Sequence, residues 1–157
     1  MTSNEQLITK FYSSFQNKDY KGMQDCYADH AKFSDAVFTD LDGEQVKAMW
    51  EMLIKNGKDL KVIFNNVKGG AAGGSAEWTA WYTFSRTGKK VINHINARFE
   101  IENGKIVKHT DSFNFYKWAR QAFGFSGILI GWTPFFQNKV RTTAMESLTK
   151  FMYRKND

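Results

Sequence analysis

An imidazole and a carboxylate, His109 and Asp111, stand two residues apart in a segment rich in apolar side chains. Side chains two apart on a strand point to the same face of a sheet. Apolar surroundings disfavour the ionised form of a carboxyl group and so make it a better general base. Asp111 is therefore a candidate for moving a proton, and His109 for orienting Asp111 or polarising a carbonyl. The structural alternative is that Asp111 lies at the rim of the sheet or is held by backbone donors.

A second carboxylate, Asp35, lies in a segment that alternates along its length. Residues 31–39 are predicted to form a strand in which Phe33, Asp35 and Val37 share one face. Asp35 would then have apolar neighbours on its own face, as Asp111 does. We take Asp35 as the second acid–base candidate.

The segment that carries His109 reads as a long hairpin over residues 91–116, with the turn Glu-Asn-Gly at 102–104. A two-residue turn would pair Arg98 with His109, whereas a three-residue turn would pair Ala97 with His109. A slip of one residue moves every side chain of one strand to the other face. The three-residue turn is preferred because it gathers one apolar face: Ile95, Ala97, Phe99, Ile101, Val107, Phe113 and Phe115.

The strand before this hairpin extends the same apolar wall. Residues 77–86 alternate, and a short turn after them would pair Phe84 with Val91 and Tyr82 with Asn93. Tyr82 and Asn93 could donate hydrogen bonds to a developing enolate. The other candidate ligand-binding side chains are aromatic, and they come from the sheet and from the helices: Tyr12, Trp50, Trp78, Phe99 and Phe113.

Three helical segments precede the long strands. A first helix begins at Thr2 and Glu5, which have capping-box spacing. A short second helix follows Asp19, and a third runs from Asp42 to Gly57. This order predicts an α+β fold in which a curved antiparallel sheet wraps the helices and leaves a conical pocket. Both carboxylates would project toward that pocket.

We expect residues 1–118 to form this cone domain and residues 119–157 to form a C-terminal helical extension packed on it. Within the extension, residues 124–136 are apolar but contain three Gly and the only Pro. This segment is too short and too broken to span a bilayer. It could form a flap over the domain or a dimer interface. It could also contact a membrane surface, because apolar residues beside basic ones suit a lipid headgroup interface.

The composition limits the classes of function. The chain has 157 residues, of which 42% are hydrophobic and 24% charged, as in a globular domain. The formal charge is +6, but the basic residues are spread along the chain, so we expect no nucleic-acid partner. One Cys excludes an internal disulfide, and the N-terminus lacks the apolar run of a signal peptide, so we expect a cytoplasmic protein. The three His residues lack metal-ligand spacing, and no metal or other cofactor is expected.

Several short motifs in this order resemble those of the nuclear transport factor 2-like superfamily, which includes ketosteroid isomerases, SnoaL-like polyketide cyclases and limonene epoxide hydrolases. The motifs are Thr87-Gly88-Lys89, Arg98-Phe99-Glu100-Ile101, Gly104-Lys105-Ile106 and His109-Thr110-Asp111-Ser112-Phe113. The order of elements agrees from about Glu5 to Tyr116, and the C-terminal extension is not covered. The resemblance is specific for fold and weak for activity, because this fold carries many chemistries.

The resemblance implies roles for the two carboxylates. Asp111 falls where cyclases and epoxide hydrolases have a general acid or base, and Asp35 resembles the base of ketosteroid isomerases. Epoxide hydrolases also need an Arg and an Asp on the strand that here reads Trp78-Thr79-Ala80, which argues against that chemistry. The isomerases' oxyanion hole uses a Tyr and a protonated Asp. Tyr12 could supply the phenol, but only apolar residues match the second group.

Taken together, the sequence favours a protein that binds an apolar small molecule and moves a proton next to its carbonyl, as an isomerase or a cyclase does. A non-catalytic binding or scaffold domain, dimeric through the outer sheet face, is the alternative. It would be favoured if Trp50, Trp78 or the C-terminal segment filled the cone. A peripheral membrane protein that uses residues 124–136 is the third hypothesis.

Overall fold

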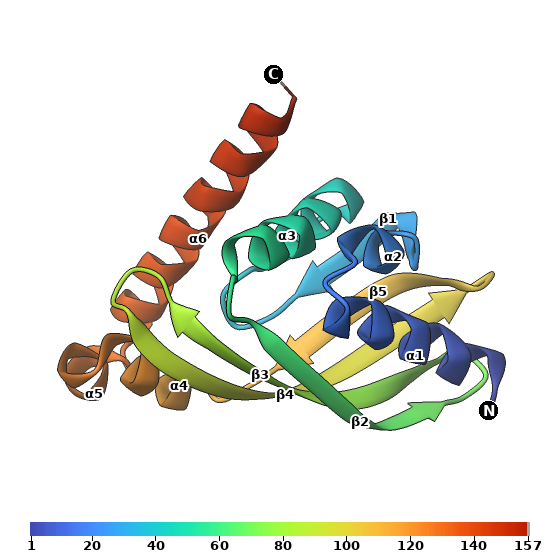
Figure 1. The fold of residues 1–157 in the computed structure, drawn as a ribbon, viewed down its shortest axis with the longest axis horizontal. Helices are drawn as coiled ribbons and strands as arrows, with labels where there is room; N and C mark the ends of the chain where they lie inside the picture. The colour runs from blue at the N-terminus through green and yellow to red at the C-terminus, as the bar shows by residue number, and fades with distance from the viewer. Residues whose placement is uncertain (157) are drawn as a thin grey trace.

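The computed structural model describes residues 1–156. Figure 1 shows α1, α2 and α3 on one side of a curved sheet, α4 and α5 at one end of it, and α6 rising beside α3. Its elements are α1 (Ser3–Gln16), α2 (Tyr20–Gln24), β1 (Tyr27–Ser34), α3 (Gly43–Asn56), β2 (Lys61–Gly69), β3 (Gly73–Phe84), β4 (Lys89–Glu102), β5 (Lys105–Ser112), α4 (Phe115–Phe123), α5 (Phe125–Ile130) and α6 (Pro134–Lys155).

Side-chain caps fix where the first and third helices begin. The hydroxyl of Thr2 accepts a hydrogen bond from the backbone N–H of Glu5, and the Glu5 carboxylate accepts one from the backbone of Thr2, both at 3.1 Å. Asp42 and Gln45 form the same reciprocal pair at the start of α3, both at 2.9 Å. Each reciprocal pair is a capping box, and it satisfies two backbone N–H donors that have no partner within the helix. The predicted starts of these helices are confirmed.

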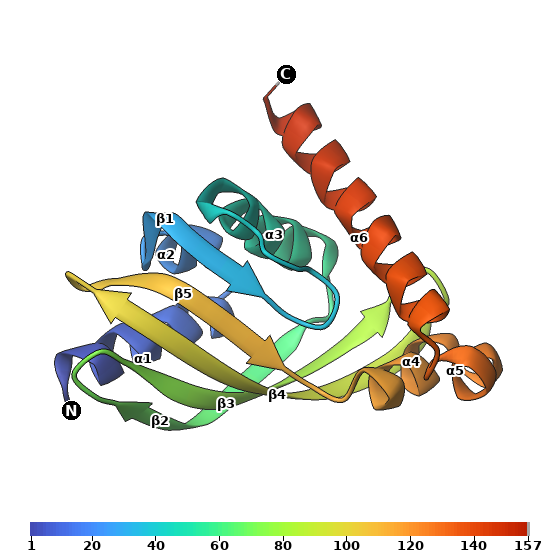
Figure 2. The same ribbon diagram turned by 180° about the vertical axis from the view of Figure 1, so that it is seen from behind.

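The sheet has five strands in the order β1-β5-β4-β3-β2, and it is curved and unclosed. Strands β2 to β5 pair antiparallel, as predicted. The exception is β1, which runs parallel to β5 and places Phe33 beside His109 (Figure 2). No tight turn joins these two strands, so the chain between them can return in either direction. The parallel edge corrects the expectation of a wholly antiparallel sheet.

The β4–β5 hairpin has a two-residue turn. Asn103 and Gly104 both adopt positive φ, at 51° and 72°, as a type I′ turn requires. Ile101 accordingly pairs with Ile106. The three-residue turn predicted from the sequence is therefore wrong, because Asn tolerates the left-handed conformation well enough for the tighter turn.

A β-bulge then restores the face that the longer turn was expected to provide. The register shifts by one residue after the turn, so that Phe99 pairs with His109 and Ala97 with Asp111. His109 and Asp111 face the interior, as predicted, but each lies two residues from its expected partner. Val107, predicted to face inward, is the extra residue of the bulge and is partly exposed.

The β3–β4 register is shifted in the same way. Tyr82 pairs with Val91 and Ala80 with Asn93, so the predicted pair of Tyr82 and Asn93 is wrong. Residues 85–88 form the connecting loop, and the shift of two residues keeps the same side chains inward. Strand β3 also begins earlier than expected, at Gly73. A Cβ there would lie 2.0 Å from a backbone oxygen of β4, so only glycine permits the close pairing.

Aromatic side chains fill the interior of the cone. Trp50 of α3 and Trp78 of β3 are 2% and 9% exposed, and their rings lie 6.1 Å apart. Most neighbouring rings meet edge to face, which aromatic pairs favour. The set comprises Phe11, Tyr12, Phe15, Tyr27, Phe33, Trp50, Trp78 and Phe99. The deep part of the predicted pocket is thus a packed core.

The C-terminal helices make two kinds of contact with the sheet domain. Trp118 and Ala122 of α4 and Phe136 of α6 form a second apolar cluster with Val91 of β4. Further along α6, Leu148 is fully buried in the main core. Helix α6 starts at Pro134, earlier than the sequence pattern indicated. The division of the chain at residue 118 stays a prediction.

The far end of α6 is fastened by a buried carboxylate. Glu51 of α3 is 1% exposed and pairs with Lys55 at 2.8 Å and with Lys155 of α6. Burial alone would raise the pKa of Glu51, but hydrogen bonds from the two ammonium groups outweigh it and hold the pKa below its ordinary value. The attraction is therefore present at neutral pH and is lost as the pH falls below about 4.

We expect Glu51→Gln to loosen the end of α6. The amide keeps the shape of the side chain but loses both ion pairs, so we expect the free energy of unfolding to fall by on the order of 1 kcal/mol. Backbone amides in the last turns of α6 should exchange faster with deuterated water. Glu146→Gln, on the exposed face of α6, is the matched control. Unchanged exchange in Glu51→Gln would show that apolar packing by residues such as Leu148 and Phe151 holds the helix without the ion pairs.

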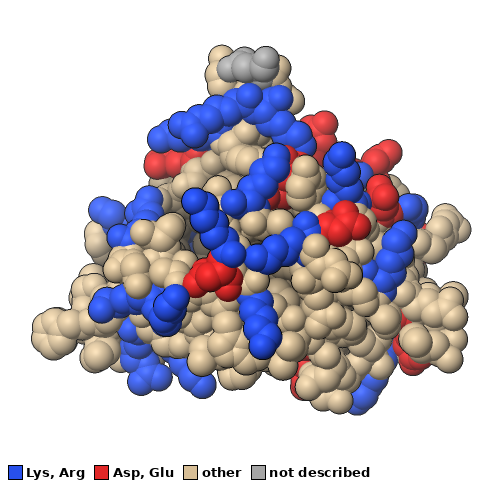
Figure 3. Space-filling view, in the orientation of Figure 1, with Lys and Arg blue, Asp and Glu red and all other residues tan. Residues whose placement is uncertain are grey.

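The surface charge is mixed. Figure 3 shows Lys and Arg spread over one face with acidic residues between them. In residues 1–156, no helix is both long enough and apolar enough to cross a membrane.

Candidate functional site

Four side chains form a continuous hydrogen-bonded chain inside the cone: Trp50 of α3, Tyr27 of β1, and His109 and Asp111 of β5. The indole N–H of Trp50 donates to the Tyr27 hydroxyl at 2.9 Å. The hydroxyl proton of Tyr27 is then free to go to His109 Nδ1, 2.7 Å away. His109 Nε2 lies 2.8 Å from Asp111 Oδ1 and donates to it. With the imidazole proton on Nε2, every donor points toward the carboxyl group of Asp111.

This chain is enclosed by rings. His109 is fully buried, with the ring of Phe99 at 4.3 Å and that of Phe33 at 4.9 Å, and Asp111 is only 4% exposed. Burial holds the pKa of the Tyr27 phenol well above its ordinary value, so that the hydroxyl keeps its proton. The chain is thus a buried set of hydrogen bonds that ends on the carboxyl group of Asp111.

Two buried polar atoms near this chain lack a hydrogen-bond partner within residues 1–156. They are the hydroxyl of Tyr12 and the indole nitrogen of Trp78. Burial, followed by the nearby charge of Asp111, raises the pKa of Tyr12 well above its ordinary value. Both atoms are therefore donors, and a buried donor without an acceptor costs about 1–3 kcal/mol.

Asp35 lies in a tight turn directly after β1. Its Oδ1 accepts hydrogen bonds from the backbone N–H groups of Val37 and Phe38, both at 2.7 Å. The strand predicted over residues 31–39 is correct only as far as Ser34, where β1 ends, because this local turn then satisfies the backbone. Within the described chain, no hydrogen bond reaches the other oxygen of Asp35, and the residue is partly exposed.

The environment of Asp35 alters its acidity. Burial raises the pKa of Asp35 to about 7, although the two backbone N–H groups act in the opposite direction. The charge of Asp111 also raises this pKa, while Arg141 of α6 lowers it. The charge of Asp111, inside the cone, therefore acts on Asp35, which is partly exposed.

Helices α4 and α6 contact Tyr82 and the loop that carries Asp35. This end of the cone is called its mouth. Trp118 of α4 donates to the hydroxyl of Tyr82 at 2.7 Å, and burial raises the pKa of Tyr82 to about 12. Gln137 and Arg141 of α6 both donate to the backbone carbonyl of Ala36, at 3.2 Å and 3.0 Å. The loop that carries Asp35 is thus held from outside by α6.

Comparison with known families identifies the domain. Residues 8–109, which include β1 to β4 and the part of β5 up to His109, match the model of the SnoaL-like domain. The chain belongs to the SnoaL-like domain family. No curated protein sequence matches this SnoaL-like domain protein.

Solved structures agree on the nuclear transport factor 2-like fold. The SnoaL-like chain is similar to a nuclear transport factor 2-like protein from Burkholderia pseudomallei, with a TM-score of 0.68, 15% identity, and 78% of this chain and 98% of that chain covered. IdmH from Streptomyces antibioticus, a proposed polyketide cyclase, gives 0.62 and 17%, with 74% and 95% covered. TerC, crystallised with polyporic acid, gives 0.66 and 12%, with 78% and 100% covered. Identities this low show the fold alone.

The other candidates of the SnoaL-like domain divide into two groups. Tyr12, Trp50, Trp78 and Phe99 pack in the interior around His109. Tyr82, Asn93 and Phe113 are half-buried nearer the mouth. Two hollows on the described surface lie elsewhere, one along α6 and one on the convex face of the sheet.

Sequence reasoning missed Tyr27, Trp118 and Arg141. Tyr27 begins β1 and supplies the centre of the hydrogen-bonded chain. No spacing in the sequence links Tyr27 to His109, because the parallel β1–β5 pairing brings them together. For metals, no group of three His, Cys, Asp or Glu side chains gathers within residues 1–156.

Proposed function

We propose that this protein binds an apolar ring compound and moves a proton next to a carbonyl of that compound, as an isomerase or an aldol-type cyclase does. The observation that carries the proposal is the carboxyl group of Asp35. It stands at the mouth of the cone with one oxygen fixed by two backbone donors and the other without a partner in the described chain. A general base works best when its pKa is close to the working pH, and the pKa of Asp35 is about 7.

In this proposal Asp111 acts on the substrate through Asp35. The sequence expectation gave Asp111 the leading role, but the burial of Asp111 favours Asp35 as the group that meets the substrate. The hydrogen-bonded chain through His109 holds the position of the Asp111 carboxyl. The charge of Asp111 then helps to keep the pKa of Asp35 near neutrality.

The remaining candidates would bind the ligand. Tyr82 and Asn93, at the mouth, would donate hydrogen bonds to an enolate oxygen, and Phe113 would pack against a ring. IdmH, a proposed polyketide cyclase, and TerC, crystallised with polyporic acid, share the fold and support a small organic compound as the ligand class.

A second candidate function is ligand binding without catalysis. The aromatic filling of the cone favours it, because Phe33 and Phe99 pack against the ring of His109, and Asp111 beside it is only 4% exposed. A scaffold of this kind would use the cone as its core. In this second function, two copies of the chain would form a homodimer through the outer face of the sheet.

Proton–deuterium exchange, followed by NMR, separates the two candidates. A panel of cyclic ketones, steroids and aromatic polyketide mimics is incubated in D₂O with the protein, and binding is followed in parallel by tryptophan fluorescence. We expect exchange next to the carbonyl for at least one compound that binds. If compounds of the panel bind but none of them exchanges a proton next to its carbonyl, the result would support ligand binding without catalysis.

A further inference from the structure

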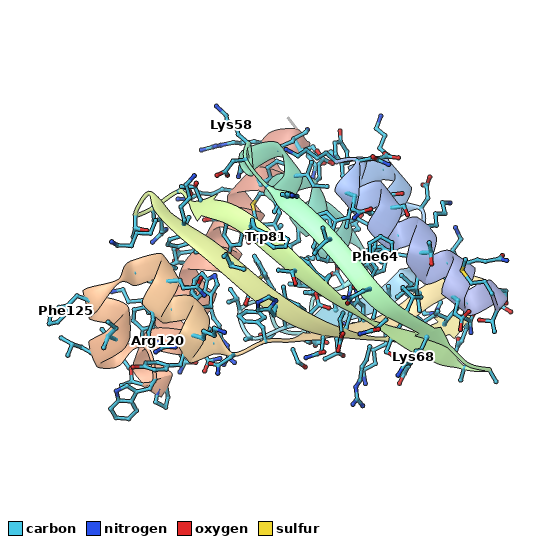
Figure 4. All side chains as sticks on the ribbon, turned by 60° about the horizontal axis from the view of Figure 1, so that its bottom comes forward. Lys58, Phe64, Lys68, Trp81, Arg120 and Phe125 are labelled. Atoms are coloured by element: carbon cyan, nitrogen blue, oxygen red, sulfur yellow. The ribbon has the colours of Figure 1, made fainter. Side chains whose placement is uncertain are left out.

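The corner formed by α5 and the first turn of α6 exposes large apolar side chains to solvent. Phe125, Trp132 and Phe135 are 75%, 70% and 74% exposed. The members of this apolar corner are Phe125, Ile128, Leu129, Ile130, Trp132 and Phe135. Figure 4 shows Phe125 at the end of the molecule away from the sheet. Single exposed apolar side chains are ordinary, but a cluster of this size marks a contact surface.

The packing of α5 explains why these side chains point outward. The helix lies against α4 through Gly127 and Gly131, and a Cβ on Gly127 would lie only 2.1 Å from the backbone oxygen of Ala119. Small residues therefore face the protein and large apolar residues face the solvent. This is the reverse of a surface helix, which buries its apolar face. A flap over the cone would instead bury these side chains.

The charge around the corner has one sign. Residues 112–145 contain no Asp or Glu. Arg120 lies over the ring of Tyr116, whose hydroxyl donates to the backbone of Ile128 in α5. The side chain of Lys89 lies beside Gly124, where α4 meets α5. Figure 3 shows this end of the face as uncharged and basic surface, in contrast to the mixed charge elsewhere.

We propose that the apolar corner docks on an anionic membrane surface. The apolar side chains would enter the headgroup region, and the basic groups around them would face the negative lipid charge. The indole of Trp132 suits this depth, since aromatic rings with a polar edge concentrate at membrane interfaces. A protein partner that matched the corner would have to be both apolar and acidic, whereas an anionic bilayer presents both features over any area.

The test uses the full-length protein with sedimenting vesicles of phosphatidylcholine alone or mixed with phosphatidylserine. Binding should be clear for the mixed vesicles at low ionic strength, weaker for phosphatidylcholine, and reduced by added salt. Brominated lipids should quench the fluorescence of Trp132, and Trp132→Phe should remove that quenching. No binding to mixed vesicles at low salt would overturn the proposal.

The double variant Phe125→Ser, Phe135→Ser should lower vesicle partitioning by at least about tenfold. Both residues are mostly exposed, so its circular dichroism and melting should match the wild type. The matched control is Ile63→Ser, Ile92→Ser, which removes two half-exposed apolar side chains from the convex sheet face and should bind like the wild type. Equal losses in both variants would overturn the proposal. The proposal would also be overturned if the wild type were a dimer in sedimentation velocity and the Phe125→Ser, Phe135→Ser variant a monomer. A second copy of the chain would then cover the corner.

Discussion

Asp35→Asn is expected to lower the rate of carbonyl-adjacent proton exchange by about 10²–10⁴-fold, the usual contribution of a positioned acid–base group. The amide can still accept the backbone hydrogen bonds of Val37 and Phe38, so the turn should persist and the ligand should still bind. What is lost is the carboxyl group that accepts the proton. The measurement is exchange by NMR on any compound that the wild-type protein turns over.

The pH profile of the wild type should reveal the same group. If Asp35 is the base, exchange requires its ionised form, so the rate should rise as the pH passes about 7 and level off above it. A profile that is flat from pH 5 to pH 9, or that inflects near pH 4, would place the proton transfer on another group. The variant's residual rate should lack this inflection.

Asp35→Asn should lower activity but raise the stability of the fold at neutral pH. A carboxyl whose pKa is higher in the folded state than in the unfolded chain weakens the fold as it ionises. The wild type should therefore lose stability as the pH rises from about 4 to about 7, and Asp35→Asn should not. Asp40→Asn is the control for activity and stability, since Asp40 is exposed in the same loop and Asn tolerates its positive φ of 52°. Similar losses of activity in the two variants would remove Asp35 from the mechanism.

Much of the fold could be predicted because the signals that decide it are local. The capping boxes at Thr2 and Asp42 fix helix starts within four residues of sequence, and alternation along β4 fixes which side chains share a face. The pairing of His109 with Asp111 follows from the same alternation. These features depend on neighbours along the chain, which a sequence displays directly.

The register and the full site depend on contacts that the sequence does not display. The bulge at Val107 changes the pairing by a residue without changing the apolar pattern, because Ile106 replaces Val107 on the inner face. The turn at Asp35 was missed because its carboxyl group competes with strand formation through local hydrogen bonds. Tyr27 and Trp50 meet His109 only after three elements assemble. The spacing of these residues along the sequence does not predict that they come into contact.

His109→Leu is expected to be the most destabilising single substitution in the site, with a loss of about 3–5 kcal/mol in the free energy of unfolding. Leucine has a suitable volume, so little cavity forms. The cost arises because Asp111 loses its donor and the Tyr27 hydroxyl loses its acceptor in an aromatic interior. Urea unfolding measures the effect. His94→Leu, on the exposed face of β4, should stay within about 0.5 kcal/mol of the wild type.

The double variant His109→Leu, Asp111→Leu decides the cause of that loss. If an unpaired carboxyl group dominates the cost, removing Asp111 as well should recover stability relative to His109→Leu, because a buried polar pair replaced by apolar groups can be nearly neutral. If the cost comes from disturbed packing of Phe99 and Phe33 around the ring, the second substitution should add to the loss. Recovery to the stability of the wild type or above would mean that the hydrogen-bonded chain adds no net stability to this core. A buried hydrogen-bonded chain that adds no stability would be explained by a role in holding the Asp111 carboxyl group in position. Additive losses would instead show that the chain is an ordinary part of the packed interior.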